Sequence, residues 1–270
     1  MKSNTKPTAE RVAVSRELER RPSSMAVALL RGAAPTSNIF EATVERLGQS
    51  IKLGLFKPGQ QLPPERELAQ IAGVSRVTVR SAIQVLIAGG FLSAKRGRNG
   101  GTFVVGNPPS WPVGQPGAVV RDSKAAMELL DQRLVIGAGV AELAAARISR
   151  PQLASLRETV GRLAELVEDL PAFRGIDAQL HIAIAEATGN ARLTRQVAEI
   201  EAELGELIGL IPRSGEALLH SNLQHARIVS CLAQGDAGAA RAAMTEHLDG
   251  TRQLLMGLLP LEAENSRVKT

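Results

Sequence analysis

The sequence predicts a mainly α-helical protein of two parts. The smaller N-terminal part combines helices with one β-hairpin, and the C-terminal part is an all-α antiparallel bundle. Apolar residues recur at helical spacing between Leu62 and Leu92, with a break at Gly73. After residue 120 the apolar positions keep a helical period, and no strand-like alternation occurs. Between these regions, residues 106–120 hold four prolines and three glycines, which is typical of a linker.

The stretch from Leu62 to Leu92 predicts two short helices joined by a tight turn. Gly73 ends the first helix, and Ser75 is a good N-cap for the second. One face of the second helix is apolar, with Val79, Ile83 and Leu86. Near its start, the other face carries Arg76, Thr78 and Arg80. Small polar and basic residues at this position are typical of a DNA-reading helix, although an ordinary amphipathic helix pair has a similar pattern.

The residues that follow predict a β-hairpin with a basic tip. Residues 91–95 and 102–105 are expected to be strands, and residues 96–101 form a glycine-rich turn. Lys95, Arg96 and Arg98 lie at or near this turn, where they can contact phosphates or enter a minor groove. Together with an opening helix over residues 38–53, which Asn38 can cap, the pattern predicts a winged helix-turn-helix domain over residues 38–105.

Charge is distributed unevenly along the chain. Residues 38–105 hold 9 Lys/Arg against 4 Asp/Glu, whereas residues 121–270 hold 16 against 20. A basic half beside an acidic half suits one module that meets phosphate and one that does not. The chain has five Phe, one Trp and no Tyr, which argues against a stacking platform for single-stranded nucleic acid.

The remaining segments complete the domain organisation. Residues 1–37 are expected to be a mostly disordered basic tail with at most one transient helix, and residues 260–270 a C-terminal tail. The single cysteine, Cys231, agrees with a reducing cytosol. The sequence shows no apolar run of membrane-spanning length and no signal-peptide pattern, so we expect a cytoplasmic protein with no membrane partner.

Residues 121–259 are expected to form the all-helical domain. Six helices are expected there, over residues 123–146, 150–170, 173–188, 190–210, 215–233 and 236–258. All four histidines of the chain lie in this domain. His220 is expected to be exposed, because it is five residues from His225 and points elsewhere around the helix.

The other three histidines and one aspartate predict a metal site. Asp177 and His181 are four residues apart, so both side chains leave one helix face. His225 and His247 are each about eleven residues from the Gly235-Asp236 turn, so antiparallel packing places them at the same height. One carboxylate and three neutral imidazoles suit a divalent ion, with Zn²⁺ preferred and Ni²⁺ or another first-row metal possible. One or two coordination positions would remain free for a carboxylate effector.

The N-terminal part resembles the GntR family of bacterial transcription regulators. The resemblance is carried by the run PGQQLPPERELAQIAGVSRVTVRSAIQVLIAGGFLSAKRGRNGGTFV, from Pro58 to Val104. It implies that one arginine of the first short helix and two of the recognition helix contact the operator, and these fall on Arg66, Arg76 and Arg80. The family's small polar positions fall on Ser75 and Thr78, and its wing glycines fall on Gly100 and Gly101.

The C-terminal part resembles the FCD ligand-binding domain of the FadR subfamily. Three segments carry this resemblance: Leu129–Ile148, DAQLHIAIAEATGN (Asp177–Asn190), and Gln224–Leu248. It implies a divalent metal held by Asp177, His181, His225 and His247, and a small organic acid as effector. It also implies that Arg133 faces the effector. The family commonly has glutamate four residues after this arginine, where this chain has Gly137.

These observations predict a dimeric transcription regulator rather than an enzyme. We expect a repressor that binds a palindromic double-stranded DNA operator as a homodimer and responds to a small organic acid. A metal-dependent hydrolase with an appended nucleic-acid-binding module is the alternative, but the sequence offers no convincing general base. A non-specific nucleoid-binding protein would leave the acidic, histidine-bearing bundle without a task.

Overall fold

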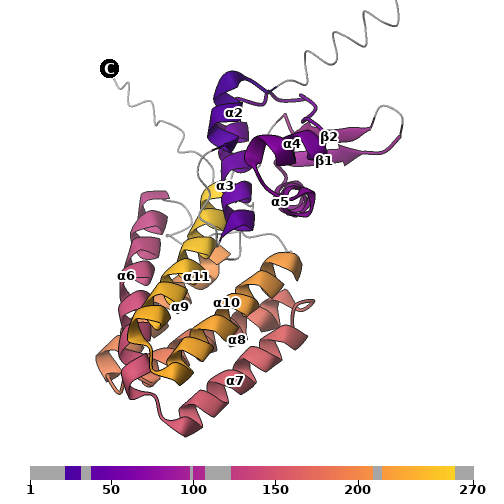
Figure 1. The fold of residues 1–270 in the computed structure, drawn as a ribbon. Helices are drawn as coiled ribbons and strands as arrows, with labels where there is room; N and C mark the ends of the chain where they lie inside the picture. Colours follow the sequence, from indigo (N-terminus) through magenta and orange to yellow (C-terminus); the bar gives the residue numbers. More distant parts are fainter. Residues whose placement is uncertain (1–21, 32–37, 98–99, 107–122, 209–214, 259–270) are drawn as a thin grey trace, which may run out of the picture.

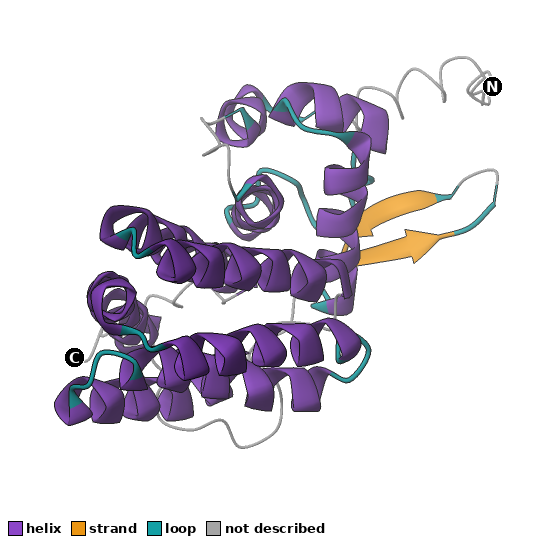
Figure 2. Ribbon diagram, turned by 60° about the horizontal axis from the view of Figure 1, so that its bottom comes forward, coloured by secondary structure: helices purple, strands orange, loops and turns teal. Residues whose placement is uncertain are grey.

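A computed structural model describes residues 22–31, 38–97, 100–106, 123–208 and 215–258. It confirms the expected fold class. A small helical domain with a β-hairpin packs on a larger bundle made of helices (Figure 1). Figure 2 shows the hairpin projecting from the small domain, away from the bundle.

The small domain contains four helices and one two-stranded sheet within the described residues. Its elements are α2 (Ser24–Leu30), α3 (Ile39–Lys52), α4 (Glu65–Ala72), α5 (Arg76–Ala88), β1 (Leu92–Lys95) and β2 (Gly101–Val104). Gly73 ends α4 with a left-handed φ of 68°, which explains why a glycine occupies this position. The Ser75 hydroxyl caps α5 by accepting a hydrogen bond from the Thr78 amide at 3.0 Å. Both sequence-based predictions for this turn are therefore confirmed.

The wing is an antiparallel hairpin fixed to the start of the helix-turn-helix. Leu92 pairs with Val104 and Lys95 with Gly101. The Gln61 side chain donates to the carbonyl of Gly100 at 2.9 Å, and Gly100 directly precedes β2. A Cβ at Gly101 would lie 2.0 Å from the Gln61 amide nitrogen, and its φ is +149°. Glycine at this position is therefore required by the hairpin itself.

The expected disordered tail differs from the structure in one segment. Residues 24–30 form α2, which the Ser23 side chain caps. Ala26 and Leu30 are buried in the same core as Phe40 and Val44 of α3. A seven-residue helix is marginal alone, so this packing explains why the segment is a helix and not the transient one that its sequence predicts.

The bundle consists of long antiparallel helices. They are α6 (Ser123–Arg147), α7 (Arg150–Glu165), α8 (Leu170–Glu186), α9 (Ala191–Ile208), α10 (Gly215–Gln234) and α11 (Ala237–Leu258). The expected boundary between α7 and α8 was wrong by several residues. The Asp169 carboxylate accepts from the Ala172 amide at 3.2 Å, so α8 begins at Leu170, directly after this cap.

The two domains are joined through helices α3 and α11, which lie side by side in Figures 1 and 2. A Cβ at Gly48 would lie 2.3 Å from the Gly257 carbonyl oxygen, so the two backbones are in direct contact. Leu254 and Leu258 of α11 belong to the core of the small domain. The last turns of α11 are therefore part of both domains.

Asn38 does not cap α3 as expected. Its side chain makes no capping hydrogen bond and instead donates to the Glu246 carbonyl of α11 at 2.7 Å.

Across the described ranges, no single helix is long and apolar enough to cross a membrane. Helices α4 and α5 pass that test only as a pair, bent by 108°.

Candidate functional site

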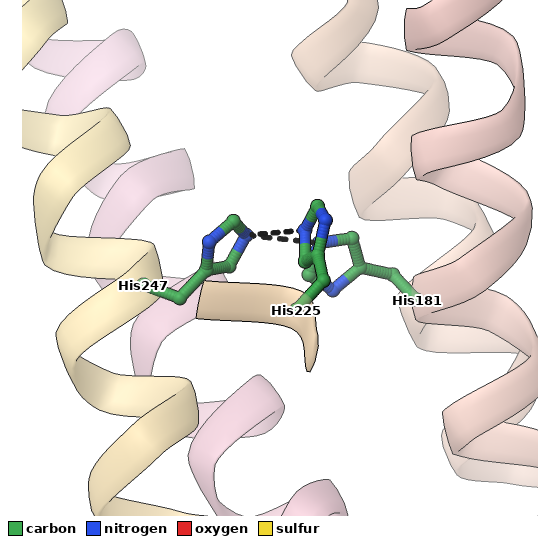
Figure 3. A group of neighbouring side chains, drawn as sticks. All are labelled: His181, His225 and His247. Carbon is green, nitrogen blue, oxygen red and sulfur yellow. Dashed lines mark hydrogen bonds between the residues drawn. The ribbon is translucent and has the colours of Figure 1, made fainter. Parts of the chain in front are cut away.

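Three histidines from three helices meet in the interior of the bundle. His181 comes from α8, His225 from α10 and His247 from α11. Figure 3 shows the three rings turned toward one another. The Nε2 atom of His247 lies 3.1 Å from that of His225 and 3.2 Å from that of His181. The prediction that His225 and His247 meet across the α10–α11 turn is confirmed.

Asp177 joins the three histidines. Its Oδ1 lies 3.2 Å from the Nε2 of His225, and its Oδ2 lies 4.0 Å from the Nε2 of His181. Four atoms bound tetrahedrally to zinc at about 2.0–2.1 Å would be about 3.3 Å apart. The spacing of the four predicted ligands is therefore close to that of a first-row metal site, and the three histidines form a group that can hold a metal ion.

Hydrogen-bond roles leave bare nitrogens in this group. Arg133 can only donate, and its Nη2 lies 3.3 Å from the Nε2 of His181, so that nitrogen is an acceptor. The Nδ1 of His247 lies 3.1 Å from the Gln224 Oε1. When this Nδ1 donates, the Nε2 of His247 is also bare. The two unprotonated Nε2 atoms of His247 and His181 then lie 3.2 Å apart, and a cation bound between them would replace the Arg133 donor at His181.

Burial keeps the histidines neutral. Burial and then the charge of Arg133 lower the pKa of His225 to about 3. Burial also lowers the pKa of His181 and His247 well below the ordinary value. Burial and the neighbouring Glu201 raise the pKa of Asp177 to about 7, against the opposing effect of Arg133 and Arg174. The contacts of Asp177 with the histidines are thus not ion pairs, and the imidazoles are in the form that binds metals.

Arg133 lies at the edge of this group and is 4 % exposed. Its Nε donates to the Glu201 Oε1 at 3.0 Å, while its buried Nη1 has no hydrogen-bond partner among the described residues. A Cβ at Gly137 would lie 2.6 Å from the Leu248 side chain, which explains the glycine as a close contact between α6 and α11. Glu201 of α9 therefore supplies the carboxylate that holds Arg133.

Glu201 was not found from the sequence. In the sequence, Glu201 is one of several glutamates in an amphipathic helix, and nothing there marks it as buried. Only the packing of α9 on α6 reveals Arg133 as its partner. His220 was also misjudged. It is half-buried, and its Nδ1 lies 2.6 Å from the Glu41 Oε1 of α3, in the other domain.

Two small cavities border the histidines. A cavity of about 10 Å³ is lined by Arg133, His181 and Glu201 together with apolar side chains. A second cavity of about 70 Å³ is lined by Arg174, Asp177 and His247, again with apolar neighbours. The first has room for about one water molecule. Each cavity is thus lined by one arginine and one carboxylate.

The predicted DNA-binding residues lie on the exposed side of the helix-turn-helix. Arg66, Arg76 and Arg80 are exposed. Thr78 is half-buried, and its hydroxyl lies 2.8 Å from that of Ser75. The Glu65 carboxylate accepts from Arg80 Nη2 at 2.9 Å and from its Nε at 3.2 Å, which holds the guanidinium in place.

The predicted wing residues are only partly described. Arg96 is exposed beside the hairpin tip, and Arg98 lies outside the described residues. A Cβ at Gly100 would lie 2.4 Å from the Lys95 carbonyl oxygen. Gly100 and Gly101 therefore shape the wing, and contact with DNA is not needed to explain them.

A winged helix-turn-helix with exposed arginines, attached to a helical domain with a buried polar centre, defines a DNA-binding transcription regulator. The chain belongs to the GntR family of bacterial regulatory proteins. The profile for "Bacterial regulatory proteins, gntR family" matches residues 40–104, and the profile for the FCD domain matches residues 128–250.

Several relatives of the chain are named as regulators. The Uxu operon transcriptional regulator of Escherichia coli K12 is 32% identical over 208 residues, covering 74% of this chain and 80% of that protein. A Bacillus subtilis regulator, LutR, is 28% identical and covers 77% and 96% of the two chains. The putative L-lactate dehydrogenase operon regulatory protein of E. coli K12 is 29% identical and covers 79% and 84%.

A solved structure is also similar to most of the chain. Streptococcus agalactiae GntR has 27% sequence identity and a TM-score of 0.44, covering 79% of this chain and 98% of that one. The family and the relatives named above are regulators, so the protein is a transcription regulator.

Proposed function

We propose that this regulator is a repressor that binds a palindromic operator as a homodimer and is controlled by a small organic acid bound beside a divalent metal ion. The observation that carries the proposal is the meeting of Asp177 with three neutral, buried histidines next to Arg133. Neutral imidazoles and a carboxylate suit Zn²⁺, and Ni²⁺ or another first-row ion also fits.

Asp177, His181, His225 and His247 would hold the metal. When bound, the metal supplies a Lewis-acid position for an oxygen of the effector. Arg133 would bind the acid through Nη1, since this buried donor has no partner among the described residues. Glu201 keeps the guanidinium in place at 3.0 Å. The buried Nη1 donor is unsatisfied within the described ranges, and so a ligand that offers an acceptor oxygen at this point is favoured.

The name of one relative agrees with this class of ligand. The putative L-lactate dehydrogenase operon regulatory protein is named for an enzyme of L-lactate, a small hydroxy acid. We expect the effector of this chain to be a small hydroxy or sugar acid, and the cavity beside Asp177 and His247 measures about 70 Å³.

At the operator, Arg76 and Arg80 would read base edges, with guanine as the base that offers a bidentate site. Ser75 and Thr78 lie beside them at the start of α5. Arg66 and the wing, with Arg96, Arg98, Gly100 and Gly101, would fix the position on phosphates. Two helix-turn-helix units that meet two half-sites about one DNA turn apart require a homodimer.

A thermal-shift experiment tests the effector and the metal together. The protein is loaded with Zn²⁺ and screened against small organic acids, since a ligand of the folded state raises the melting temperature. We expect a concentration-dependent rise that is lost in His225→Ala and retained in His220→Ala. A rise of equal size in His225→Ala would show that the metal is not part of the effector site. A full panel without any response would refute the proposed ligand class.

A further inference from the structure

We infer that Gln224 and Asn38 couple the metal centre to the DNA-binding domain. This inference rests on the proposed metal site and adds the residues through which its state reaches the other domain. The observation is a buried chain of hydrogen bonds from His247, through Gln224 of α10, to Asn38 at the start of α3. Both amide side chains are buried, and Asn38 is only 2 % exposed.

The direction of this chain follows from its last acceptor. The Glu246 carbonyl can only accept, so the group 2.7 Å from it is the Nδ2 of Asn38. The Asn38 Oδ1 then accepts from the Nε2 of Gln224 at 2.8 Å. This leaves the Gln224 Oε1 for the Nδ1–H of His247, at 3.1 Å. One backbone carbonyl thereby fixes which nitrogen of His247 is free to bind a metal.

Such a partner of a metal ligand both orients the ring and raises its basicity. Here the partner also contacts the other domain. Asn38 immediately precedes α3, and its two bonds hold this end of the helix against α10 and α11. The Glu246 carbonyl belongs to the peptide that leads into His247. The metal ligand and the anchor of the DNA-binding domain are therefore on adjacent residues of α11.

Movement of the His247 ring cannot leave this chain unchanged. If metal binding draws the ring toward His181 and His225, the Gln224 amide must follow, or a buried donor or acceptor is left unsatisfied. A shift of Gln224 acts on Asn38, and Asn38 acts on the start of α3. Helix α3 packs against α5, and Val44 and Leu86 belong to the core that the two helices share, so we expect α5 to move with α3.

A second contact between α10 and α3 supplies a matched control. His220 lies one turn before Gln224 on α10, and it contacts Glu41 one turn along α3. This pair joins the same two helices, and its hydrogen bond does not involve a predicted metal ligand. Loss of the His220 contact should therefore weaken docking without removing communication with the metal centre.

Two near-isosteric variants break the chain at single atoms. Gln224→Glu keeps an oxygen for the Nδ1–H of His247 and loses the donor to Asn38. Asn38→Asp keeps the acceptor for Gln224 and loses the donor to the Glu246 carbonyl. The His247 contact survives in both, so both variants should still bind Zn²⁺.

The experiment measures the dissociation constant for DNA with and without Zn²⁺. The probe is a duplex that the wild-type protein selects from a random-sequence pool, and Zn²⁺ binding is measured in parallel by calorimetry. The ratio of the two constants reports the coupling between the sites. In the wild type and in His220→Ala we expect a ratio of at least about fivefold, which is the lower end of typical coupling. In Gln224→Glu and Asn38→Asp the ratio should fall to about one while Zn²⁺ still binds.

The outcomes separate this inference from the proposed function. If Gln224→Glu and Asn38→Asp both keep the wild-type ratio of DNA dissociation constants, the inference is wrong and the metal site stands. If the wild type binds Zn²⁺ but its ratio is one, the inference is also wrong, because the metal does not communicate with DNA. If the wild type binds no Zn²⁺, the proposed metal site fails and the inference fails with it.

Discussion

Replacing Gly48 with alanine tests the docking of the two domains directly. The added Cβ would lie 2.3 Å from the Gly257 carbonyl oxygen, and backbone atoms cannot rotate away as a side chain can. Helices α3 and α11 would have to separate by about 1 Å to restore ordinary contact. Overpacking of this kind costs about 1–3 kcal/mol. Alanine recovers about 1 kcal/mol through its higher helix propensity, so we expect a net loss of about 1 kcal/mol.

Gly161→Ala is the matched control. Gly161 is also inside a helix, α7, but nothing lies within 4 Å of a Cβ at this position. This variant should gain about 1 kcal/mol from propensity alone. Urea denaturation followed by circular dichroism should therefore separate the two variants by about 2 kcal/mol, and the melting temperature of Gly48→Ala should fall by roughly 2–4 °C. Equal stability of the two variants would show that the backbones of α3 and α11 do not touch.

Three further predictions concern the metal centre, the DNA surface and a buried lysine. His225→Ala should lower bound Zn²⁺ at least tenfold in elemental analysis, while His220→Ala retains it; unchanged metal in the first variant would contradict the ligand assignment. Arg76→Ala should weaken binding to a selected duplex by about 1–3 kcal/mol more than binding to random DNA, and equal losses on both would make Arg76 a phosphate contact. Burial lowers the pKa of Lys52 to about 8 from 10.5, so the unfolded chain holds this proton to higher pH. The stability of the wild type relative to Lys52→Met should thus rise between about pH 8 and 10.5, and a pH-independent difference would exclude this titration.

Local sequence signals predicted the parts of the fold that local chemistry determines. The glycine at position 73 and the serine at position 75 define the turn of the helix-turn-helix, because a left-handed residue and a capping hydroxyl are needed there. Equal spacing from one turn also placed His225 beside His247. These inferences need only the geometry of a single helix or a helical hairpin.

Contacts between distant helices were not accessible in this way. The pairing of Arg133 with Glu201 joins residues 68 positions apart, and that of Asn38 with Gln224 joins residues 186 apart. A helical period shows which face is apolar, but not which polar residue of another helix will meet it. Helix α2 was expected only as a transient helix for the same reason, since its burial depends on a surface formed by α3.

The shared core at the end of α11 changes how the protein divides into units. The FCD profile ends at residue 250, yet Leu254 and Leu258 lie beyond it and complete the interior of the DNA-binding domain. A fragment that stopped after β2 would lack both leucines and would expose the apolar face that they cover. A chain cut between β2 and α6 would instead keep the contact of α11 with the small domain, so its two pieces should remain associated after cleavage. In folding terms, the hydrophobic core of the N-terminal domain is complete only when the last two turns of α11, from the far end of the chain, have packed against it.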